Sequence, residues 1–285
     1  MSLASTPESR APQPGGESSG DLVSPAASAR RTGEFDAAIF DLDGVVTRTA
    51  AVHAAAWKQM FDAYLRARAE RHGGGFRPFT GEDYRAFVDG RPRYQGVAAF
   101  LQSRSIDLPM GAPDDPPDAE TVCGLGNRKN DAFNRRIAAG GVGIFESTVA
   151  LMRALRHGGV RLGLATSSRN AAAVLAATGL SDWFGTVVDG AVSARLGLAG
   201  KPQPDIFVTA ARDLAVPCPR AIVIEDAVAG VCAGVAGGFG LVIGVARENN
   251  LDELRASGAD LVVRDLAETN VEEIGRLVRA KRVRA

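Results

Sequence analysis

Cysteine and histidine are both scarce in this chain, with three of each among 285 residues. The cysteines (Cys123, Cys218 and Cys232) lie far apart, form no Cys-x-x-Cys pair and have no histidine close to them in sequence. We therefore expect reduced thiols in a cytosolic protein, and neither a disulfide framework nor a cysteine-based metal site. The chain also lacks a long apolar run and a basic start followed by an apolar core, so we expect no membrane-spanning segment and no signal peptide.

Excess charge of either sign is missing as well. Lys and Arg number 33, Asp and Glu number 33, and the net charge is +0, which gives no support to nucleic-acid binding. We expect neither nucleic acid nor a membrane as a partner, and a monomer. Large apolar side chains are almost absent from residues 1–33, which are rich in Ser, Pro, Ala and Gly, so this segment is predicted to be a disordered tail.

The rest of the chain divides into two patterns. Residues 50–139 contain only helical patterns, interrupted by an exposed Pro- and Asp-rich loop at 109–118, and they predict an inserted helical cap. Residues 34–49 and 140–285 predict a core of alternating short strands and helices. Repeated βα units imply an α/β fold with a doubly wound, Rossmann-like parallel sheet. The expected strands cover 37–40, 160–165, 186–188, 221–224, 241–245 and 261–263, and the core helices lie near 147–157, 170–178, 204–215, 227–236 and 250–257.

Two carboxylates follow the first expected strand directly. Asp41 and Asp43 are one residue apart, and Gly44 gives the backbone freedom to turn sharply after them. Ligands of open α/β sheets bind at the carboxyl ends of strands. Two acids this close suit a nucleophile beside a general acid with a divalent cation between them, although the same residues also fit an ordinary strand end that runs into a turn.

Polar residues of other kinds occur at later strand ends and in one loop. Each has a plain alternative: the hydroxyls could cap a helix, the lysine could be solvated, and the second acidic pair could be an acidic N-cap. Their combination is more specific, because carboxylates suit Mg²⁺ and hydroxyls with a lysine suit phosphoryl oxygens. We interpret it as a phosphoryl-transfer site with a covalent aspartate intermediate. These residues are Thr166, Ser167 and Ser168, then Lys201, then Glu225 and Asp226.

The chain resembles a known superfamily at these positions, the haloacid dehalogenase-like (HAD) phosphotransferases. The four matching motifs are Asp41-Leu-Asp43-Gly44-Val-Val-Thr47, Thr166-Ser167-Ser168, Lys201-Pro202 and Glu225-Asp226. Within the superfamily it is most similar to the β-phosphoglucomutase family. The residues that carry this second resemblance are Thr49-Ala50, His53, Trp57-Lys58, Gly90 with Arg93, Arg128-Lys129-Asn130, Ser168-Arg169-Asn170 and Lys201-Pro-Gln-Pro-Asp205-Ile-Phe207.

The resemblance implies chemical roles at the acidic end of the site. Asp41 would be the nucleophile that forms an aspartyl phosphate, and Asp43 would be the general acid and base. Mg²⁺ would be held by the Asp41 carboxylate, the Asp43 carbonyl and Asp226, with Glu225 supporting.

It also implies two phosphate subsites. Thr166 and Lys201 would bind the transferring phosphoryl group, and Arg93 of the cap would bind the distal phosphate of a sugar bisphosphate. His53 would link cap closure to Asp43. Without the resemblance, Arg93 and Lys129 could equally be exposed helix charges. His53 and Trp57, four residues apart, could be a core-facing pair under the cap. The remaining substrate-binding residues would be Trp57, Gly90, Lys129, Ser167, Ser168, Arg169 and Asn170.

The function implied is interconversion of β-D-glucose 1-phosphate and glucose 6-phosphate through an aspartyl-phosphate enzyme and a 1,6-bisphosphate. One alternative is a Mg²⁺-dependent sugar-phosphate phosphatase with the same site, and another is a non-catalytic binding module. Arg48, where many relatives carry an acid, Phe145-Glu146-Ser147, which replaces the usual aromatic-Pro-Gly, and the loop at 109–118 depart from the family pattern. These departures bear on the substrate rather than on the chemistry.

Overall fold

A computed structural model describes residues 33–247 and 249–284. The tail predicted at 1–33 therefore lies outside the described residues except for Gly33. Within the described part of the chain, no helix combines the length and the hydropathy needed to cross a bilayer.

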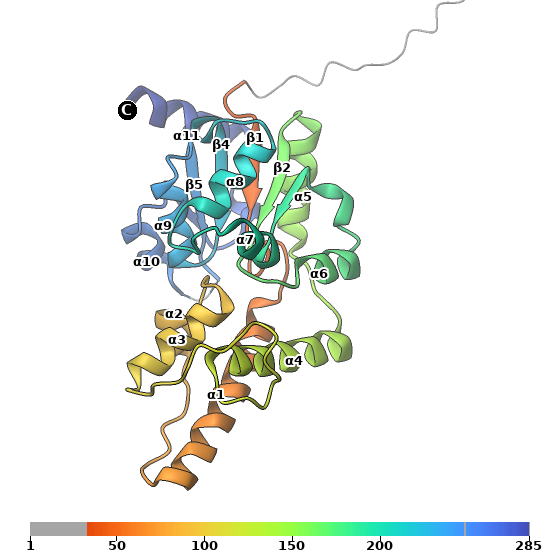
Figure 1. The fold of residues 1–285 in the computed structure, drawn as a ribbon. Helices are drawn as coiled ribbons and strands as arrows, with labels where there is room; N and C mark the ends of the chain where they lie inside the picture. The colour runs from red at the N-terminus through yellow and green to blue at the C-terminus, as the bar shows by residue number, and fades with distance from the viewer. Residues whose placement is uncertain (1–32, 248, 285) are drawn as a thin grey trace, which may run out of the picture.

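The core is a six-stranded, fully parallel sheet in the order β3-β2-β1-β4-β5-β6, which confirms the predicted fold class. The first strand lies at the centre, between β2 and β4, so the segment that follows it opens at the middle of the sheet edge (Figure 1). The strands are β1 (Ala37–Phe40), β2 (Arg161–Ala165), β3 (Thr186–Val188), β4 (Ala221–Glu225), β5 (Leu241–Val245) and β6 (Leu261–Val263).

Helices cover both faces of this sheet, because successive side chains of a strand point to opposite faces. Phe40 packs in one apolar cluster with α5, α6 and α11, whereas Ile39 packs in another with α8, α9 and α10. The helices of the core are α5 (Glu146–His157), α6 (Ala171–Thr178), α7 (Gly190–Leu196), α8 (Asp205–Asp213), α9 (Val228–Ala236), α10 (Leu251–Ala256) and α11 (Val271–Arg284), with short 3₁₀ turns η1 (Ser181–Trp183), η2 (Cys218–Arg220) and η3 (Leu266–Glu268).

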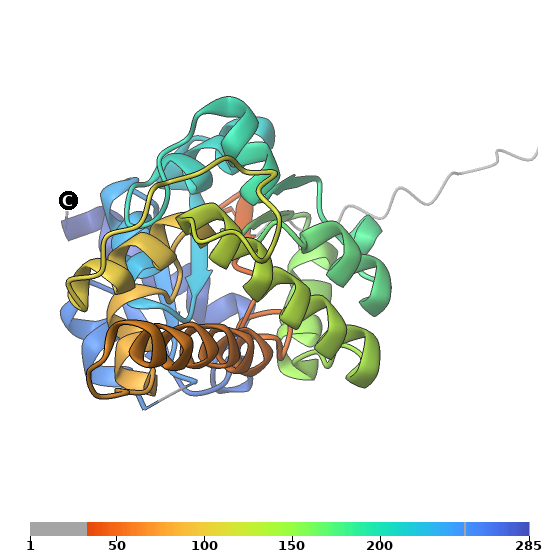
Figure 2. The ribbon, with the colours of Figure 1, turned by 60° about the horizontal axis from the view of Figure 1, so that its bottom comes forward.

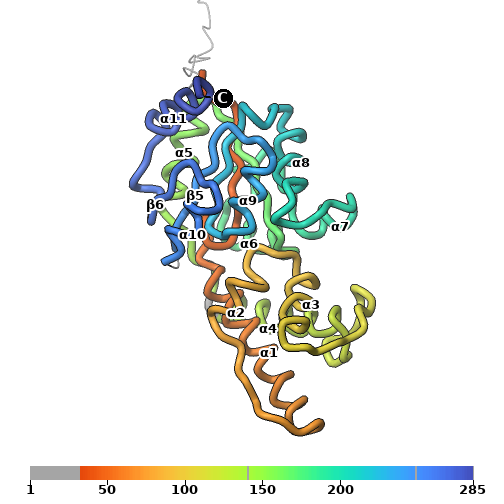
Figure 3. The backbone as a smooth tube through the Cα atoms, turned by 90° about the vertical axis from the view of Figure 1, so that its left-hand side faces the viewer, coloured from red at the N-terminus to blue at the C-terminus, as the bar shows by residue number. Residues whose placement is uncertain are grey.

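Four helices form a separate layer at the carboxyl ends of the strands; Figure 3 shows this layer at one end of the sheet, and in Figure 2 it is turned toward the viewer. They occupy the range predicted for the inserted cap, although the division into domains stays a prediction. Phe61, Phe79 and Phe100 pack against one another at its centre, with ring centroids 4.2–4.9 Å apart, and belong to an apolar cluster of the layer's own. The cap helices are α1 (Ala50–His72), α2 (Gly81–Phe87), α3 (Arg93–Ser103) and α4 (Val122–Gly140).

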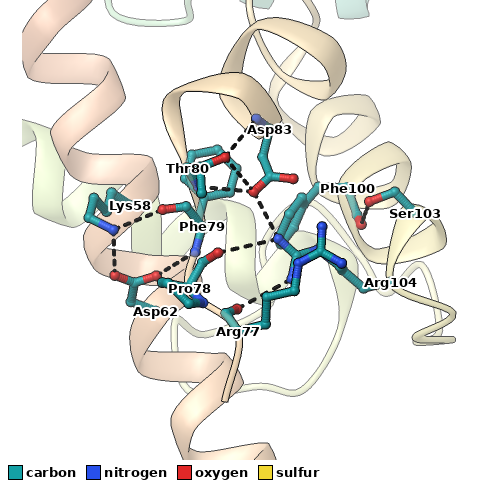
Figure 4. Close-up of polar contacts among 10 residues, drawn as sticks. All are labelled: Lys58, Asp62, Arg77, Pro78, Phe79, Thr80, Asp83, Phe100, Ser103 and Arg104. Carbon is teal, nitrogen blue, oxygen red and sulfur yellow. Dashed lines mark hydrogen bonds and ion pairs between the residues drawn. The ribbon is translucent and has the colours of Figure 1, made fainter. Parts of the chain in front are cut away.

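Two carboxylates, the partly exposed Asp62 and the buried Asp83, hold the connection between α1 and α2 in place (Figure 4). Asp62 accepts hydrogen bonds from the Phe79 amide and from Lys58, 2.8 and 2.9 Å away. Asp83 accepts bonds from the Thr80 amide and from Arg104, at 2.9 and 2.8 Å. The loop is thereby tied to α1 and α3, which orients α2 and the site residues that follow it.

Two linkers connect cap and core, and they pair with each other. Thr47 bridges to Ile144 in an isolated antiparallel pair, and the Phe145 amide donates to the Val46 carbonyl at 3.0 Å. Thr148 donates its hydroxyl to Val45 O at 2.7 Å. The hinge region of the cap is therefore a short two-stranded strip directly behind the first acidic loop.

The structure adds helices α7 and α11 and the three 3₁₀ turns to the expected elements. Neither α7 nor α11 was predicted, and Lys201 does not follow a strand directly, because α7 lies between β3 and the lysine loop. All the strands and helices that were predicted are present, with boundaries that differ by a few residues.

Candidate active site

Every residue that the sequence analysis assigned to the site lines one cavity of about 70 Å³ between the cap and the carboxyl edge of the sheet. Asp41 follows β1, Thr166 follows β2, and the second acidic pair lies at the end of β4. Parallel pairing of β1 with β2 and β4 aligns these ends at one edge, which explains why they meet. Their individual roles stay predictions.

Three carboxylates gather at the bottom of the cavity. One oxygen each of Asp41, Glu225 and Asp226 lies within 4.8 Å of the others. Gly44 makes this possible: its φ is +92°, and a Cβ there would lie 1.8 Å from an Asp226 carboxylate oxygen. A side chain at position 44 would therefore displace the acid.

Lys201 is the cation that faces this acidic group. Its ammonium lies 2.6 Å from Asp41 Oδ1 and 2.5 Å from Glu225 Oε1, and the side chain is only 1% exposed. Burial alone would lower the pKa of Lys201, but the two carboxylates outweigh it and raise the pKa above its ordinary value. The lysine therefore stays charged, and the alternative of a solvated loop lysine is wrong.

One lysine does not balance three clustered acids, of which Asp41 and Glu225 are buried and Asp226 is partly exposed. Burial, reinforced by repulsion from Glu225 and Asp43, raises the pKa of Asp41 to about 8 despite the nearby Lys201. Burial and the charges of Glu225, Asp89 and Asp41 raise the pKa of Asp226 well above its usual range. Such a site favours an added cation, and its oxygen donors are of the kind that Mg²⁺ prefers. The residues present therefore fit Mg²⁺.

Glu225 differs from the other two acids because both of its carboxylate oxygens accept hydrogen bonds from other residues of the protein. Oε1 accepts from Lys201, and Oε2 accepts from the amides of Asp226 and Ala227 at 2.6 and 2.8 Å. It orients the lysine and the Asp226 loop. The N-cap of α9 is Ala227, so the alternative of an acidic N-cap is wrong.

Asp43 lies at the start of a chain of contacts that leads into the cap. It accepts a hydrogen bond from Thr49, and its Oδ1 lies 3.3 Å from His53 Nε2. His53 Nδ1 contacts the ammonium of Lys129, and the imidazole stacks on Phe133 with centroids 4.0 Å apart. Cap helices α1 and α4 are thus joined to the acidic loop through two basic side chains.

The electrostatics of this chain follow from its burial. Burial would raise the pKa of Asp43, but His53, Thr49 and Lys129 outweigh it and lower the pKa. Burial and repulsion from Lys129 lower the pKa of His53, despite the neighbouring carboxylate. Burial, with repulsion from Arg93, lowers the pKa of Lys129 to about 7. Lys129 is 3% exposed, so the alternative of an exposed helix charge is wrong for it.

Lys129 also explains the place of Trp57. Its ammonium lies 4.9 Å from the Trp57 ring and 5.1 Å from the Phe133 ring, distances typical of cation–π contacts. Trp57 belongs both to the cap's apolar cluster and to the cavity wall. Trp57 therefore packs in the core of the cap and also lines the cavity, and its role in substrate binding stays a prediction.

Cap and core touch each other across the cavity. Ser167 donates its hydroxyl to Gly90 O at 2.8 Å, and Asn170 donates to Asn130 Oδ1 at 3.0 Å. Arg93 donates to the same Asn130 oxygen at 2.7 Å. The described conformation is therefore closed over the site.

The hydroxyl cluster after β2 lines this closed cavity. Thr166 is buried and its Oγ1 accepts from the Ser168 amide, whereas Ser168 Oγ accepts from the Asn170 amide. Asn170 is the N-cap of α6 and makes no side-chain cap bond. The alternative of a plain Ser or Thr N-cap is wrong. Arg169 lies beside this cluster on the cavity wall.

Sequence reasoning missed some residues in the cavity wall and one residue that contacts it. Asp89 and Arg91 line the cavity from the cap loop before α3, and Asn130 joins Arg93 to Asn170. Asp89 and Arg91 flank Gly90, whose place in the family pattern was the one available signal. Asn130 stood beside Lys129 in the resembling motif without a role.

Comparison with known proteins agrees with this geometry. A family model described as haloacid dehalogenase-like hydrolase matches residues 35–238. A β-phosphoglucomutase of Mycobacterium bovis is 48% identical over 236 residues, which cover 81% of this chain and 90% of that protein. A β-phosphoglucomutase of Bacillus subtilis is 32% identical over 243 residues, with 83% and 92% covered. The crystal structure of a β-phosphoglucomutase from Clostridium difficile superposes with a TM-score of 0.70 at 25% identity, covering 87% of this chain and 99% of that one.

The chain is therefore a haloacid dehalogenase-like protein, an enzyme that acts as a phosphotransferase or a phosphatase. Within that superfamily it belongs to the β-phosphoglucomutase family. Both memberships were predicted from the motifs, and both are confirmed.

Proposed function

We propose that the protein is a β-phosphoglucomutase, which interconverts β-D-glucose 1-phosphate and glucose 6-phosphate through an aspartyl phosphate and a 1,6-bisphosphate. The observation that carries this proposal is the presence of two cationic sets in one closed cavity. Lys201 lies beside Asp41 at the sheet edge, and Arg93 and Lys129 enter from the cap. A bisphosphate that must present each end in turn needs both sets, whereas a plain phosphatase needs only the first.

The roles of the acids follow from their surroundings. An Asp41 oxygen would form a bond to phosphorus while the bond between phosphorus and the sugar oxygen breaks. Lys201 and Thr166 would bind the oxygens of the transferring group. Asp41, Asp226 and the Asp43 carbonyl would hold Mg²⁺, with Glu225 supporting, and the ion would neutralise charge on the phosphoryl oxygens.

Asp43 would move the proton in both halves of the cycle. Its lowered pKa suits it to begin as a base, taking the proton from the sugar 6-hydroxyl as that oxygen attacks the aspartyl phosphate. After the bisphosphate has turned around, the same carboxyl would return the proton to O1 as the C1 phosphoryl group passes to Asp41. Glucose 6-phosphate would leave, and the phosphoenzyme would be restored.

Cap closure would protect the phosphoenzyme from water. The contacts of Ser167 with Gly90 and of Asn170 with Asn130 join the two layers at the cavity that contains the acids. His53 and Lys129 would transmit closure to Asp43, because they connect α1 and α4 to that carboxylate. Water exclusion is what separates transfer from hydrolysis at a shared site.

Product analysis tests the proposal. Incubation with β-D-glucose 1-phosphate, Mg²⁺ and a trace of glucose 1,6-bisphosphate should give glucose 6-phosphate well in excess of inorganic phosphate. Asp41→Asn, with its fold checked by circular dichroism, should give neither product. Inorganic phosphate without glucose 6-phosphate would contradict the mutase.

A phosphatase is the second candidate, since the matching family model is that of a hydrolase. The same acids would then pass the phosphoryl group to water. A panel of anomeric hexose phosphates, assayed for both products, would identify the preferred substrate in either case.

A further inference from the structure

One arginine outside the predicted site contacts three separate parts of the molecule. Arg247 lies in the segment between β5 and α10. Its Nε donates to Gly44 O at 3.0 Å, and its Nη1 donates to Arg264 O and Asp265 Oδ2 at 3.1 and 2.9 Å. Its guanidinium carbon lies 3.6 Å from the centroid of the Phe145 ring. The side chain is only 14% exposed, so these contacts are largely shielded from water.

The first contact reaches the acidic loop. Gly44 follows Asp43 immediately, and its Cα faces the Asp226 carboxylate so closely that no Cβ fits between them. A shift of the Gly44 peptide would therefore change the spacing of the acids on both loops. The same segment after β5 also holds the second loop, because Asn250 Nδ2 donates to Asp226 O at 2.9 Å.

The second contact reaches the hinge. Phe145 ends the linker by which the chain returns from the cap, and its amide pairs with the outgoing linker at Val46. Arg48 of that outgoing linker also lies over the Phe145 ring, 4.3 Å from its centroid, but bonds to Ile144 O rather than to the acidic loop. Of these two arginines, Arg247 alone joins the ring to Gly44.

We propose that Arg247 is a positioning residue that couples the cap hinge to the acidic loop. Movement of Phe145 as the cap opens is transmitted through the guanidinium to Gly44, and so to the spacing between Asp41 and Asp226. Cation binding and cap closure are then linked, and each favours the other. The inference rests on the proposed function for the identity of the cation site.

Metal binding measured without any sugar phosphate tests the coupling. Mn²⁺ serves as the probe, and the free ion is counted by electron paramagnetic resonance. Arg247→Gln should weaken Mn²⁺ binding by about tenfold, the lower end of the range for residues that orient metal ligands. The matched control is Arg48→Gln, which removes a guanidinium from the same ring but leaves the Gly44 bond, and should bind Mn²⁺ like the wild type.

A second variant covers the case in which Arg247→Gln does not fold. Arg247→Lys keeps a positive charge near Phe145, but lysine has a single side-chain nitrogen. Arg247 uses two nitrogens to donate to its three acceptors. It should also raise the Mn²⁺ dissociation constant, to a smaller extent. In assays at saturating Mg²⁺, we expect a larger share of hydrolysis relative to transfer for each folded Arg247 variant.

The outcomes are distinguishable. Wild-type Mn²⁺ affinity in the folded Arg247 variants would overturn the inference, as would an equal loss in Arg48→Gln. Failure of the wild-type protein itself to bind Mn²⁺ would instead contradict the cation site of the proposed function.

Discussion

The ammonium of Lys201 lies 2.6 Å from a carboxylate oxygen of Asp41, although 160 positions separate them along the chain. Both side chains are buried, and Glu225 completes the contact on the other side of the lysine. Charge balance at the centre of the sheet edge therefore depends on one side chain from a loop.

Replacing that lysine should cost stability as well as activity. Lys201→Met leaves Asp41 and Glu225 buried without their cation, so we expect a loss of about 3–5 kcal/mol in the free energy of unfolding. The loss should be larger at pH 9 than at pH 6, because Asp41, whose pKa is raised to about 8, can take up a proton at the lower pH. Urea unfolding at both pH values measures it.

The matched control is the partly exposed pair of Lys58 and Asp62, with nitrogen and oxygen 2.9 Å apart and side chains 55% and 16% exposed. Lys58→Met should cost about 1 kcal/mol or less. Equal losses in the two variants would contradict the special role of Lys201.

The lowered pKa of Lys129 predicts a pH dependence of stability. Its pKa falls from 10.5 to about 7 on folding, so between these values the unfolded chain binds the proton more tightly. Stability of the wild type should therefore rise with pH across this window, by up to about 1.4 kcal/mol per pH unit from this residue. Below pH 7 the full cost of burying the charge is present, and above pH 10.5 it is absent.

Lys129→Met lacks this titration. The variant should be more stable than the wild type at pH 6–7, and the difference should shrink as the pH approaches 10. Unfolding free energies measured at several pH values test this, and parallel pH curves for the two proteins would count against it. Its activity should still fall, because a cap cation has been lost.

Removal of Mg²⁺ should lower the stability of the wild type. Removal of the Asp226 carboxylate should instead relieve a cost that the metal-free protein carries as the pH rises. With the acids unbalanced, Mg²⁺ should stabilise the wild type by about 2.7 kcal/mol at a concentration of 100 times its dissociation constant, and a chelator should reverse the gain. The raised pKa of Asp226 means that the folded state holds this proton more tightly. The metal-free wild type should therefore lose stability as the pH rises above the ordinary aspartate range.

Asp226→Asn should lose both the Mg²⁺ gain and this pH-dependent cost. Asp189→Asn is the control, because Asp189 caps α7 away from the acidic cluster and asparagine is also a good N-cap. A full Mg²⁺-dependent melting shift in Asp226→Asn would refute the assignment of this acid to the cation site.

Several elements could be predicted from the sequence because their signals lie within short contiguous segments. The first strand and the Asp41–Gly44 turn are adjacent in sequence, and so are the hydroxyl cluster after β2 and its strand. The helices α7 and α11 were missed although signals existed: Asp189 and Gly197 bound α7, and Ile274 and Val278 are four residues apart on α11.

Other site features have no local signal. Nothing near Lys201 in sequence indicates that its ammonium reaches two carboxylates, and nothing near Asn130 indicates that it joins Arg93 to Asn170. In the sequence, Arg247 is an ordinary loop arginine. Only the structure shows that it contacts both Gly44 and Phe145.

The sequence by itself determined the fold class, the family and the chemical types of the site residues, because apolar periodicity and contiguous motifs are properties of short segments. The tertiary structure alone decided which charges face each other, how deeply they are buried and how the hinge contacts the acidic loop. Charge balance and pKa depend on distances and burial among residues that are remote in sequence, and those quantities exist only once the chain has packed.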